Sequence, residues 1–376
     1  MVKESMLIFI SFFLVCSSCS FKREPPKAFT SEIARIKSTW APDKRTAVFT
    51  IKYDYQDGKW QISGETSVIK AREAVMQLAK ATFSDREVDL DFRILPLEEF
   101  GDTTAALVNV SVGNLRRTPK YSAELVDQVL MGMELKLLKT KSYWYLVQTP
   151  YNYLGWITRG TITRKSNEEI SQWENAEKYT LSINFDHVFS EPSDKSQVVC
   201  DLVLGSAFIK KSQEGRWTEI ELPDGRAGYI KTVNINRYKS TNNEILPDRN
   251  DIINRAKKMM GIPYLWGGNS TKGMDCSGFT STVFKSEGYQ LPRDANMQVK
   301  LGEEVIPQDD YSNVLPGDLI FFGPPDRITH VAISLGGSYF IHSSADVHVN
   351  SLNEKDELFN AYRKRTFRRI KRIINN

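Results

Sequence analysis

The chain has 376 residues, of which 41% are hydrophobic and 26% charged, and its formal net charge is +4 at pH 7. This composition is that of a globular protein of two to four domains; it excludes a disordered or fibrous chain and does not indicate a nucleic-acid partner. Four cysteines and four histidines are too few for a disulfide framework, and they show no recognisable metal-ligand spacing. We therefore expect neither a metal nor another cofactor.

The amino terminus has the pattern of an export signal. Lys3 precedes an apolar run at residues 6–15, about half the length of a membrane-spanning helix, and small residues follow. The segment resembles a bacterial lipoprotein signal over residues 1–18, which implies lipidation of Cys19. Lipidation of Cys16 and cleavage without lipidation are the alternatives. The lipid would be the only membrane attachment, and the chain would lie in the periplasm or on the membrane of the cell envelope.

A small α/β module is predicted next. Residues 19–29 are charged and contain prolines, which suits a linker. In AVFTIKYDYQDGKWQISGET, apolar and polar residues alternate on both sides of Asp-Gly, which predicts a β-hairpin. SVIKAREAVMQLAKATF then has helical spacing, and VDLDFRILPL alternates as a strand. We interpret residues 30–110 as a β-β-α-β module without identifiable chemistry.

Two similar stretches follow, over residues 111–168 and 178–238. Each begins with a polar Pro-containing segment and continues with short alternating runs separated by turns. Trp144 in the first corresponds to Trp217 in the second, and a Gly-aromatic-Ile triplet closes both. Short strands at this spacing predict small β-barrels, and the pattern resembles tandem bacterial SH3 domains.

The residues that could carry out a chemical reaction lie in the last third of the chain. GIPYLWGGNSTKGMDCSGFTSTVF places Cys276 after a Gly-rich loop, at the start of a helical run. A helix amino terminus favours a thiolate, and hence a nucleophile. HVAISLGGSYFIH predicts two antiparallel strands joined at Gly336, which would place His330 directly opposite His342. A nucleophile, a base and an orienting group suit acyl transfer.

Five ordered motifs, PYLWGG, DCSGF, LPRDA, LPGDLIFF and HVAISLGGSYFIH, resemble the NlpC/p60 family of papain-like cell-wall peptidases. The resemblance implies an α+β fold, in which a catalytic domain at residues 246–376 follows two SH3-like barrels and the amino-terminal module. It further implies that Cys276 is the nucleophile, His330 the general base and His342 the orienting residue. Met274 and Ala295 depart from the expected pattern, and Ala295 replaces a serine near the substrate.

The domain order narrows the substrate. SH3 domains ahead of such a domain resemble γ-D-glutamyl-L-diamino acid endopeptidases, which cut peptidoglycan stem peptides. The resemblance implies that the first SH3 domain closes the cleft and selects a free N-terminal L-alanine, whose amine needs acidic or phenolic partners. The implied contacts are Tyr264, Asp275, Ser277 and Asp294 from the catalytic domain, and Glu124 and Tyr153 from the first SH3 domain.

Alternatives remain at this point. Asp275 could be a helix N-cap and Tyr264 a core residue. The chain could be an inactive peptidoglycan-binding lipoprotein, or an amidase or acyltransferase that uses the same triad. Zinc binding by His330, His342 and His348 lacks a recognisable ligand spacing. We expect a monomer whose partners are stem peptides rather than nucleic acid.

Overall fold

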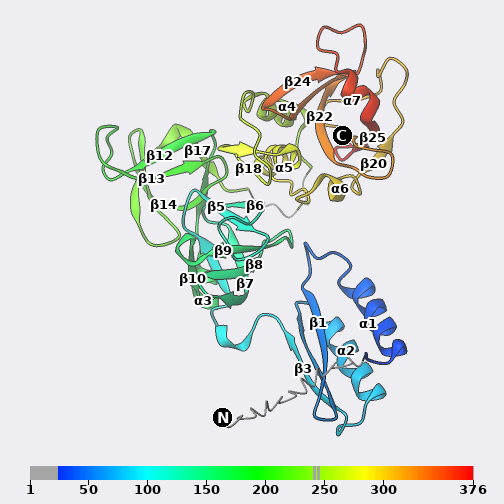
Figure 1. Ribbon diagram of the computed structural model, residues 1–376. Helices are drawn as coiled ribbons and strands as arrows, with labels where there is room; N and C mark the ends of the chain where they lie inside the picture. The colour runs from blue at the N-terminus through cyan, green and yellow to red at the C-terminus, as the bar shows by residue number, and fades with distance from the viewer. Residues whose placement is uncertain (1–23, 240–242, 244–245, 376) are drawn as a thin grey trace, which may run out of the picture.

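The computed structural model describes residues 24–239, 243 and 246–375. The predicted signal peptide, including Cys16 and Cys19, lies outside the described residues. Figure 1 shows the amino-terminal module at the bottom, two barrels in the middle and left, and the carboxy-terminal domain at the upper right. The helices within the described ranges include none with the length and apolar character that crossing a membrane requires.

The amino-terminal module contains α1 (Lys27–Trp40), β1 (Phe49–Gln56), β2 (Lys59–Thr66), α2 (Ile69–Thr82) and β3 (Val88–Ile94). The hairpin β1–β2 is antiparallel, as predicted, because Asp57 and Gly58 take the positive φ angles of a two-residue turn. The strand β3 pairs with β2 in parallel, and both helices pack against the sheet around Phe29 and Trp60. Helix α1 was not predicted, and it begins inside the predicted linker.

The first barrel is a seven-stranded sheet in the order β10-β4-β7-β8-β9-β5-β6. Its strands are β4 (Ala105–Val108), β5 (Val112–Arg116), β6 (Leu125–Leu130), β7 (Glu134–Lys141), β8 (Trp144–Gln148), β9 (Leu154–Thr158) and β10 (Ile162–Lys165). Short 3-10 turns, η1 (Glu98–Phe100) and η2 (Arg159–Thr161), precede β4 and β10. Because β4 pairs with β7 and β10, residues 105–108 belong to this sheet, whereas the sequence pattern placed them in the amino-terminal module.

The second barrel repeats the arrangement in the order β13-β12-β16-β15-β14-β11-β17. It follows α3 (Asn167–Asn175) and contains β11 (Lys178–Leu181), β12 (Phe185–Phe189), β13 (Val198–Val203), β14 (Ala207–Glu214), β15 (Trp217–Glu221), β16 (Ala227–Lys231), η3 (Thr232–Asn234) and β17 (Ile235–Arg237). The repeated tryptophans start β8 and β15 and are both buried. Gly155 and Gly228 stand at equivalent places, where a Cβ atom would lie 2.6 Å from Leu115 and 2.5 Å from Val188.

The carboxy-terminal domain is built on a six-stranded sheet in the order β20-β25-β21-β22-β23-β24. The strands are β20 (Glu303–Val305), β21 (Leu319–Phe322), β22 (His330–Gly336), β23 (Tyr339–Ser343), β24 (Val347–Ser351) and β25 (Phe367–Arg372), with a small pair, β18 (Asn269–Ser270) and β19 (Gly273–Met274). The helices are α4 (Arg249–Lys257), α5 (Cys276–Ser286), α6 (Ala295–Gln298) and α7 (Ala361–Thr366).

Helix α5 packs on the sheet through a buried apolar core that includes Phe279, Val283, Phe321, Val331 and Ile333. The basic carboxy-terminal segment contains both a helix and a strand, because α7 ends where β25 begins. The fold is α+β, as predicted, with a small sheet module and two barrels ahead of the carboxy-terminal domain.

Candidate active site

Cys276 is the first residue of α5, and Asp275, the residue before it, is the N-cap of this helix. The Asp275 carboxylate caps the helix, accepting from the Gly278 N–H at 2.7 Å, and it also accepts from the Gly267 N–H at 3.1 Å. The predicted N-cap role of Asp275 is therefore present. The Cys276 side chain is buried in the same apolar core as Val331, the residue that follows His330 on β22. The nucleophile candidate thus lies at the junction of α5 and β22.

The resting thiol is protonated, contrary to the expectation from the helix amino terminus. Burial, followed by the charge of Asp275, raises the pKa of the Cys276 thiol to about 12. Burial, followed by the charges of Arg363 and His342, lowers the pKa of His330 well below its ordinary value. The predicted place of the thiol at a helix amino terminus is observed, but the sequence did not show the burial that raises the thiol pKa. Both groups therefore start neutral, and proton transfer would create their charges together.

His330 and His342 meet through their rings, although they are not directly opposite each other. His330 Nε2 lies 2.8 Å from His342 Nδ1. In the observed register Ile333 pairs with Ile341, so the residue opposite His342 is Ala332 and His330 is its diagonal neighbour. An irregularity between Ser334 and Gly336 shifts the centre of the turn by one residue from the predicted position. The predicted partnership exists, but the predicted cross-strand pairing was wrong.

A chain of hydrogen bonds fixes the tautomers of both histidines. The Arg363 backbone N–H donates to Asn360 Oδ1 at 3.0 Å, so the amide nitrogen of Asn360 must donate to Asn350 Oδ1, at 2.9 Å. Asn350 Oδ1 can only accept, so His342 Nε2, 3.0 Å away, carries a proton. Neutral His342 therefore accepts at Nδ1 from the Nε2–H of His330. The remaining nitrogen of His330, Nδ1, is left unprotonated and can act as a base.

Two further residues, His348 and Arg363, lie close to the paired histidines. His348 pairs with His342 across β23 and β24, with ring centroids 4.6 Å apart, and its Nδ1 lies 2.8 Å from Asp346 Oδ1. The Arg363 guanidinium lies over the ring of Phe322, which also packs against His330. No three His, Cys, Asp or Glu side chains in the described part of the chain gather as metal ligands. Register and packing brought these residues together, and no motif identifies them.

A cavity of about 330 Å³ opens beside Cys276, and all six predicted substrate contacts line it. They are Tyr264, Asp275, Ser277, Asp294, Glu124 and Tyr153. Burial, followed by the charges of Cys276 and Asp275, raises the pKa of Tyr264 to about 12, so its phenol stays a hydrogen-bond donor. Ala295, where a serine was expected, also lines the cavity and offers no hydroxyl.

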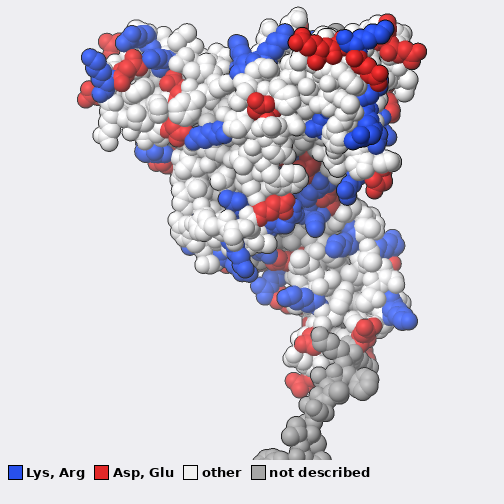
Figure 2. Space-filling model, turned by 45° about the horizontal axis from the view of Figure 1, so that its top comes forward, with Lys and Arg blue, Asp and Glu red and all other residues white. Residues whose placement is uncertain are grey.

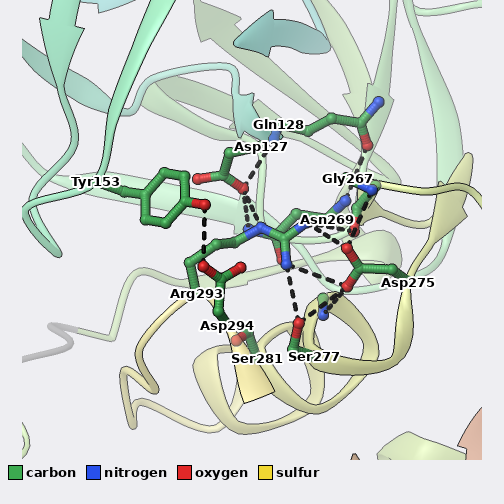
Figure 3. A network of polar contacts seen from close by, with 12 residues as sticks. Asp127, Gln128, Tyr153, Gly267, Asn269, Asp275, Ser277, Ser281, Arg293 and Asp294 are labelled. Carbon is green, nitrogen blue, oxygen red and sulfur yellow. Dashed lines mark hydrogen bonds and ion pairs between the residues drawn. The ribbon is translucent and has the colours of Figure 1, made fainter. Parts of the chain in front are cut away.

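Arg293 joins the first barrel to the residues at the start of α5 (Figure 3). The Arg293 side chain is 1% exposed, and its guanidinium contacts Asp127 Oδ1 on β6 at 2.7 Å and Asp275 Oδ2 at 2.7 Å. It also donates to Ser277 Oγ at 3.1 Å. Asp275 and Ser277 therefore line the cavity and are also hydrogen-bonded to Arg293. Arg293 lies within the LPRDA motif, but its pairing with Asp127 was not predicted, because it joins two domains.

The barrel and the catalytic domain also meet around the rim. Glu124 pairs with Arg117 and accepts from the Trp266 indole N–H at 3.1 Å. The Tyr153 phenol donates to Asp294 Oδ2 at 3.0 Å. Gly267 in the PYLWGG motif has a φ of +75°, and a Cβ atom there would lie 2.2 Å from the Leu125 carbonyl oxygen. Glycine thus permits the close approach of this loop to β6.

Known proteins share this architecture. The NlpC/P60 family profile matches residues 261–371, and the bacterial SH3 domain profile matches residues 111–163. The chain is 30% identical over 231 residues to a γ-D-glutamyl-L-lysine dipeptidyl-peptidase of Bacillus cereus, an alignment that covers 58% of this chain and 67% of the relative. It is 29% identical over 263 residues to dipeptidyl-peptidase 6 of Lysinibacillus sphaericus, covering 68% of this chain and 94% of the relative.

A solved structure of an NlpC/P60 family protein from Bacillus cereus matches with a TM-score of 0.61 and 25% identity, covering 72% of this chain and 99% of that one. The chain therefore belongs to the NlpC/P60 family of cysteine peptidases, with bacterial SH3-like domains ahead of the catalytic domain. Its relatives include γ-D-glutamyl-L-lysine dipeptidyl-peptidases, and the family predicted from the five motifs is confirmed.

Proposed function

We propose that this protein is a γ-D-glutamyl-L-diamino acid endopeptidase that acts on peptidoglycan stem peptides with a free N-terminal L-alanine. The observation that carries the proposal is the convergence of Cys276 and six candidate substrate contacts on one cavity, whose wall is shared by the catalytic domain and the first barrel. The relatives named for γ-D-glutamyl-L-lysine cleavage support the same bond.

The proposed reaction begins with His330 Nδ1, which takes the proton of the Cys276 thiol. The thiolate attacks the γ-carbonyl carbon of D-glutamate, and the resulting oxyanion faces backbone donors that include the Cys276 N–H at the start of α5. The imidazolium then protonates the leaving amine of the diamino acid as the C–N bond breaks. Water, deprotonated by His330, releases the dipeptide and restores the thiol. His342 holds His330 in the tautomer that leaves Nδ1 free.

The proposed selectivity for a free amine follows from the chemistry of the cavity wall. Glu124 and Asp294 provide carboxylates, and Tyr153 and Tyr264 provide phenols. Burial and the charge of Asp294 raise the pKa of Tyr153 above its usual range, so this phenol remains protonated. Carboxylates attract a positively charged ammonium group and accept its hydrogen bonds, whereas an acylated nitrogen is neutral. Small freed peptides are therefore the proposed substrates, rather than intact wall.

The first test is Cys276→Ala, assayed by mass spectrometry on L-Ala-γ-D-Glu-L-Lys. The wild-type protein should release L-Ala-γ-D-Glu, and the variant should release none, because no other described residue provides a thiol at this cavity. Undiminished release by the variant would remove Cys276 from the reaction. A different mass loss would favour an amidase or acyltransferase, and binding to peptidoglycan without cleavage would favour an inactive wall-binding protein.

The proposed place of action is the cell envelope. Membership in a family of cell-wall hydrolases implies a location outside the cytoplasm. Lipidation at Cys19 is part of the proposal and would hold the protein at the membrane. Metabolic labelling with an alkyne fatty acid tests it, since the wild-type chain should take up label and a Cys19→Ala variant should not.

A further inference from the structure

The amino-terminal module, which had no predicted chemistry, contributes a side chain to the catalytic cavity. Arg45, in the segment between α1 and β1, lines the cavity together with Cys276. Its Nη1 lies 2.7 Å from Asp294 Oδ2 and 3.0 Å from Asn296 Oδ1. Figure 2 shows acidic and basic side chains gathered where the module, toward the bottom, meets the body of the molecule. The cavity is therefore closed from three parts of the chain.

Arg45 is held in place from its own side. The Asp43 carboxylate accepts two hydrogen bonds from the guanidinium, from Nε to Oδ1 at 3.0 Å and from Nη2 to Oδ2 at 2.6 Å. The backbone is fixed to the first barrel, since the Leu154 N–H donates to the Arg45 carbonyl at 2.8 Å and the Gln148 amide donates to the Thr46 carbonyl at 2.9 Å. A bidentate arginine–carboxylate pair on an anchored segment loses little additional freedom when it binds another group.

The contacts leave one oxygen of Asp294 available. Arg45 and Tyr153 both donate to Oδ2, and within the described residues no hydrogen bond reaches Oδ1. Figure 3 shows the Tyr153 phenol directed at Asp294, whose second oxygen carries no contact to the residues drawn. The positive charge of Arg45 does not cancel the negative charge of Asp294, because the Asp43 carboxylate already balances Arg45. Asp294, which lines the cavity, thus has one carboxylate oxygen bound by Arg45 and Tyr153 and a second oxygen without a hydrogen bond among the described residues.

The module also lies outside the parts of the chain that define the family. The two family profiles match only residues 111–163 and 261–371. The solved Bacillus cereus structure is covered almost completely, at 99%, by 72% of this chain. Position 45 therefore lies outside both matched profiles.

We propose that Arg45 is a positioning residue through which the amino-terminal module orients Asp294, so that the free Asp294 oxygen receives the N-terminal ammonium of the substrate. The inference rests on the proposed function, because it assumes a substrate with a free amine. It gives the module a part in substrate selection. The prediction is specific to the amine, since an acylated substrate has no ammonium to present to Asp294.

The test compares Arg45→Ala, Arg45→Lys and Asp43→Asn with wild type on L-Ala-γ-D-Glu-L-Lys and its N-acetyl form. Arg45→Ala should raise KM for the free-amine peptide about fivefold to tenfold and leave kcat within about twofold, because ground-state binding alone is lost. Arg45→Lys should raise KM less than Arg45→Ala does, and Asp43→Asn should give a KM between those of wild type and Arg45→Ala. The N-acetyl peptide should be cleaved at the same low rate by all four proteins.

Arg93→Ala is the matched control, because Arg93 forms the same kind of bidentate pair with Asp91 in the same module but does not line the cavity. It should keep the wild-type KM. The inference is overturned if Arg45→Ala and Asp43→Asn behave like this control, or if both peptides lose activity equally, which would indicate a structural role only. A wild-type protein that cleaves both peptides equally would instead overturn the proposed amine selectivity itself, before any variant is compared.

Discussion

Asn350 should control activity without touching the substrate, because it is the acceptor that fixes the proton of His342. In Asn350→Leu the His342 Nε2–H loses its partner at 3.0 Å. An unpaired buried donor costs about 1–3 kcal/mol. The other tautomer places a proton on His342 Nδ1, facing His330 Nε2–H across 2.8 Å, and so forces the His330 proton onto the nitrogen that must act as the base. The same 1–3 kcal/mol in the transition state corresponds to a loss in kcat of about 5- to 150-fold.

The assay is kcat and KM on L-Ala-γ-D-Glu-L-Lys, with the histidine tautomers followed by ¹⁵N NMR. Asn350→Asp retains an acceptor and should keep activity within a few-fold of wild type. Asn353→Leu is the matched control, because Asn353 lies in the same domain and, among the described residues, its side-chain oxygen accepts only the backbone N–H of Lys355. The reasoning is refuted if Asn350→Leu keeps the wild-type kcat, or if Asn350→Asp falls as far as the leucine variant.

Two further predictions concern stability. Arg293→Met removes the cation between buried Asp127 and Asp275 and should lower the free energy of unfolding by about 3–5 kcal/mol in urea denaturation; a change below 1 kcal/mol would show that these carboxylates find other partners. Burial, followed by the charge of Arg363, lowers the pKa of His342 to about 3. The unfolded chain therefore binds this proton first, and stability present above pH 6.5 falls by about 1.4 kcal/mol per pH unit below it. His342→Gln should show a shallower slope, and equal slopes for both proteins would contradict the assignment.

Local sequence signals predicted local structure well. Asp57 and Gly58 determine a hairpin through their own backbone preferences, and the structure has that hairpin. Asp248, a residue type that favours helix N-caps, stands directly before α4 and accepts from the Asn250 and Asp251 N–H groups. The motif around Cys276 placed the thiol at the start of a helix. In each case the cause lies within a few residues of the effect, so the pattern was sufficient.

Features that depend on contact between distant segments were missed. Arg45 and Asp294 are 249 residues apart, and nothing near Arg45 distinguishes it from a surface arginine. The register of β22 and β23 depended on a local irregularity, which the alternation of apolar residues does not reveal. The direction of the Cys276 pKa shift was wrong because it depends on burial under segments far along the chain. Family resemblance provided the candidate contacts, and the fold added Arg45, Arg293, Asn350 and Asn360.

The central claim is that Cys276 cleaves the γ-D-glutamyl bond of a peptide whose alanine amine is free. The most direct measurement is mass spectrometry of L-Ala-γ-D-Glu-L-Lys and its N-acetyl form after incubation with wild type and with Cys276→Ala. The account predicts that wild type releases L-Ala-γ-D-Glu much faster from the free peptide, and that the variant releases nothing. Equal release from both peptides would contradict the amine selectivity, and release by Cys276→Ala would contradict the proposed chemistry.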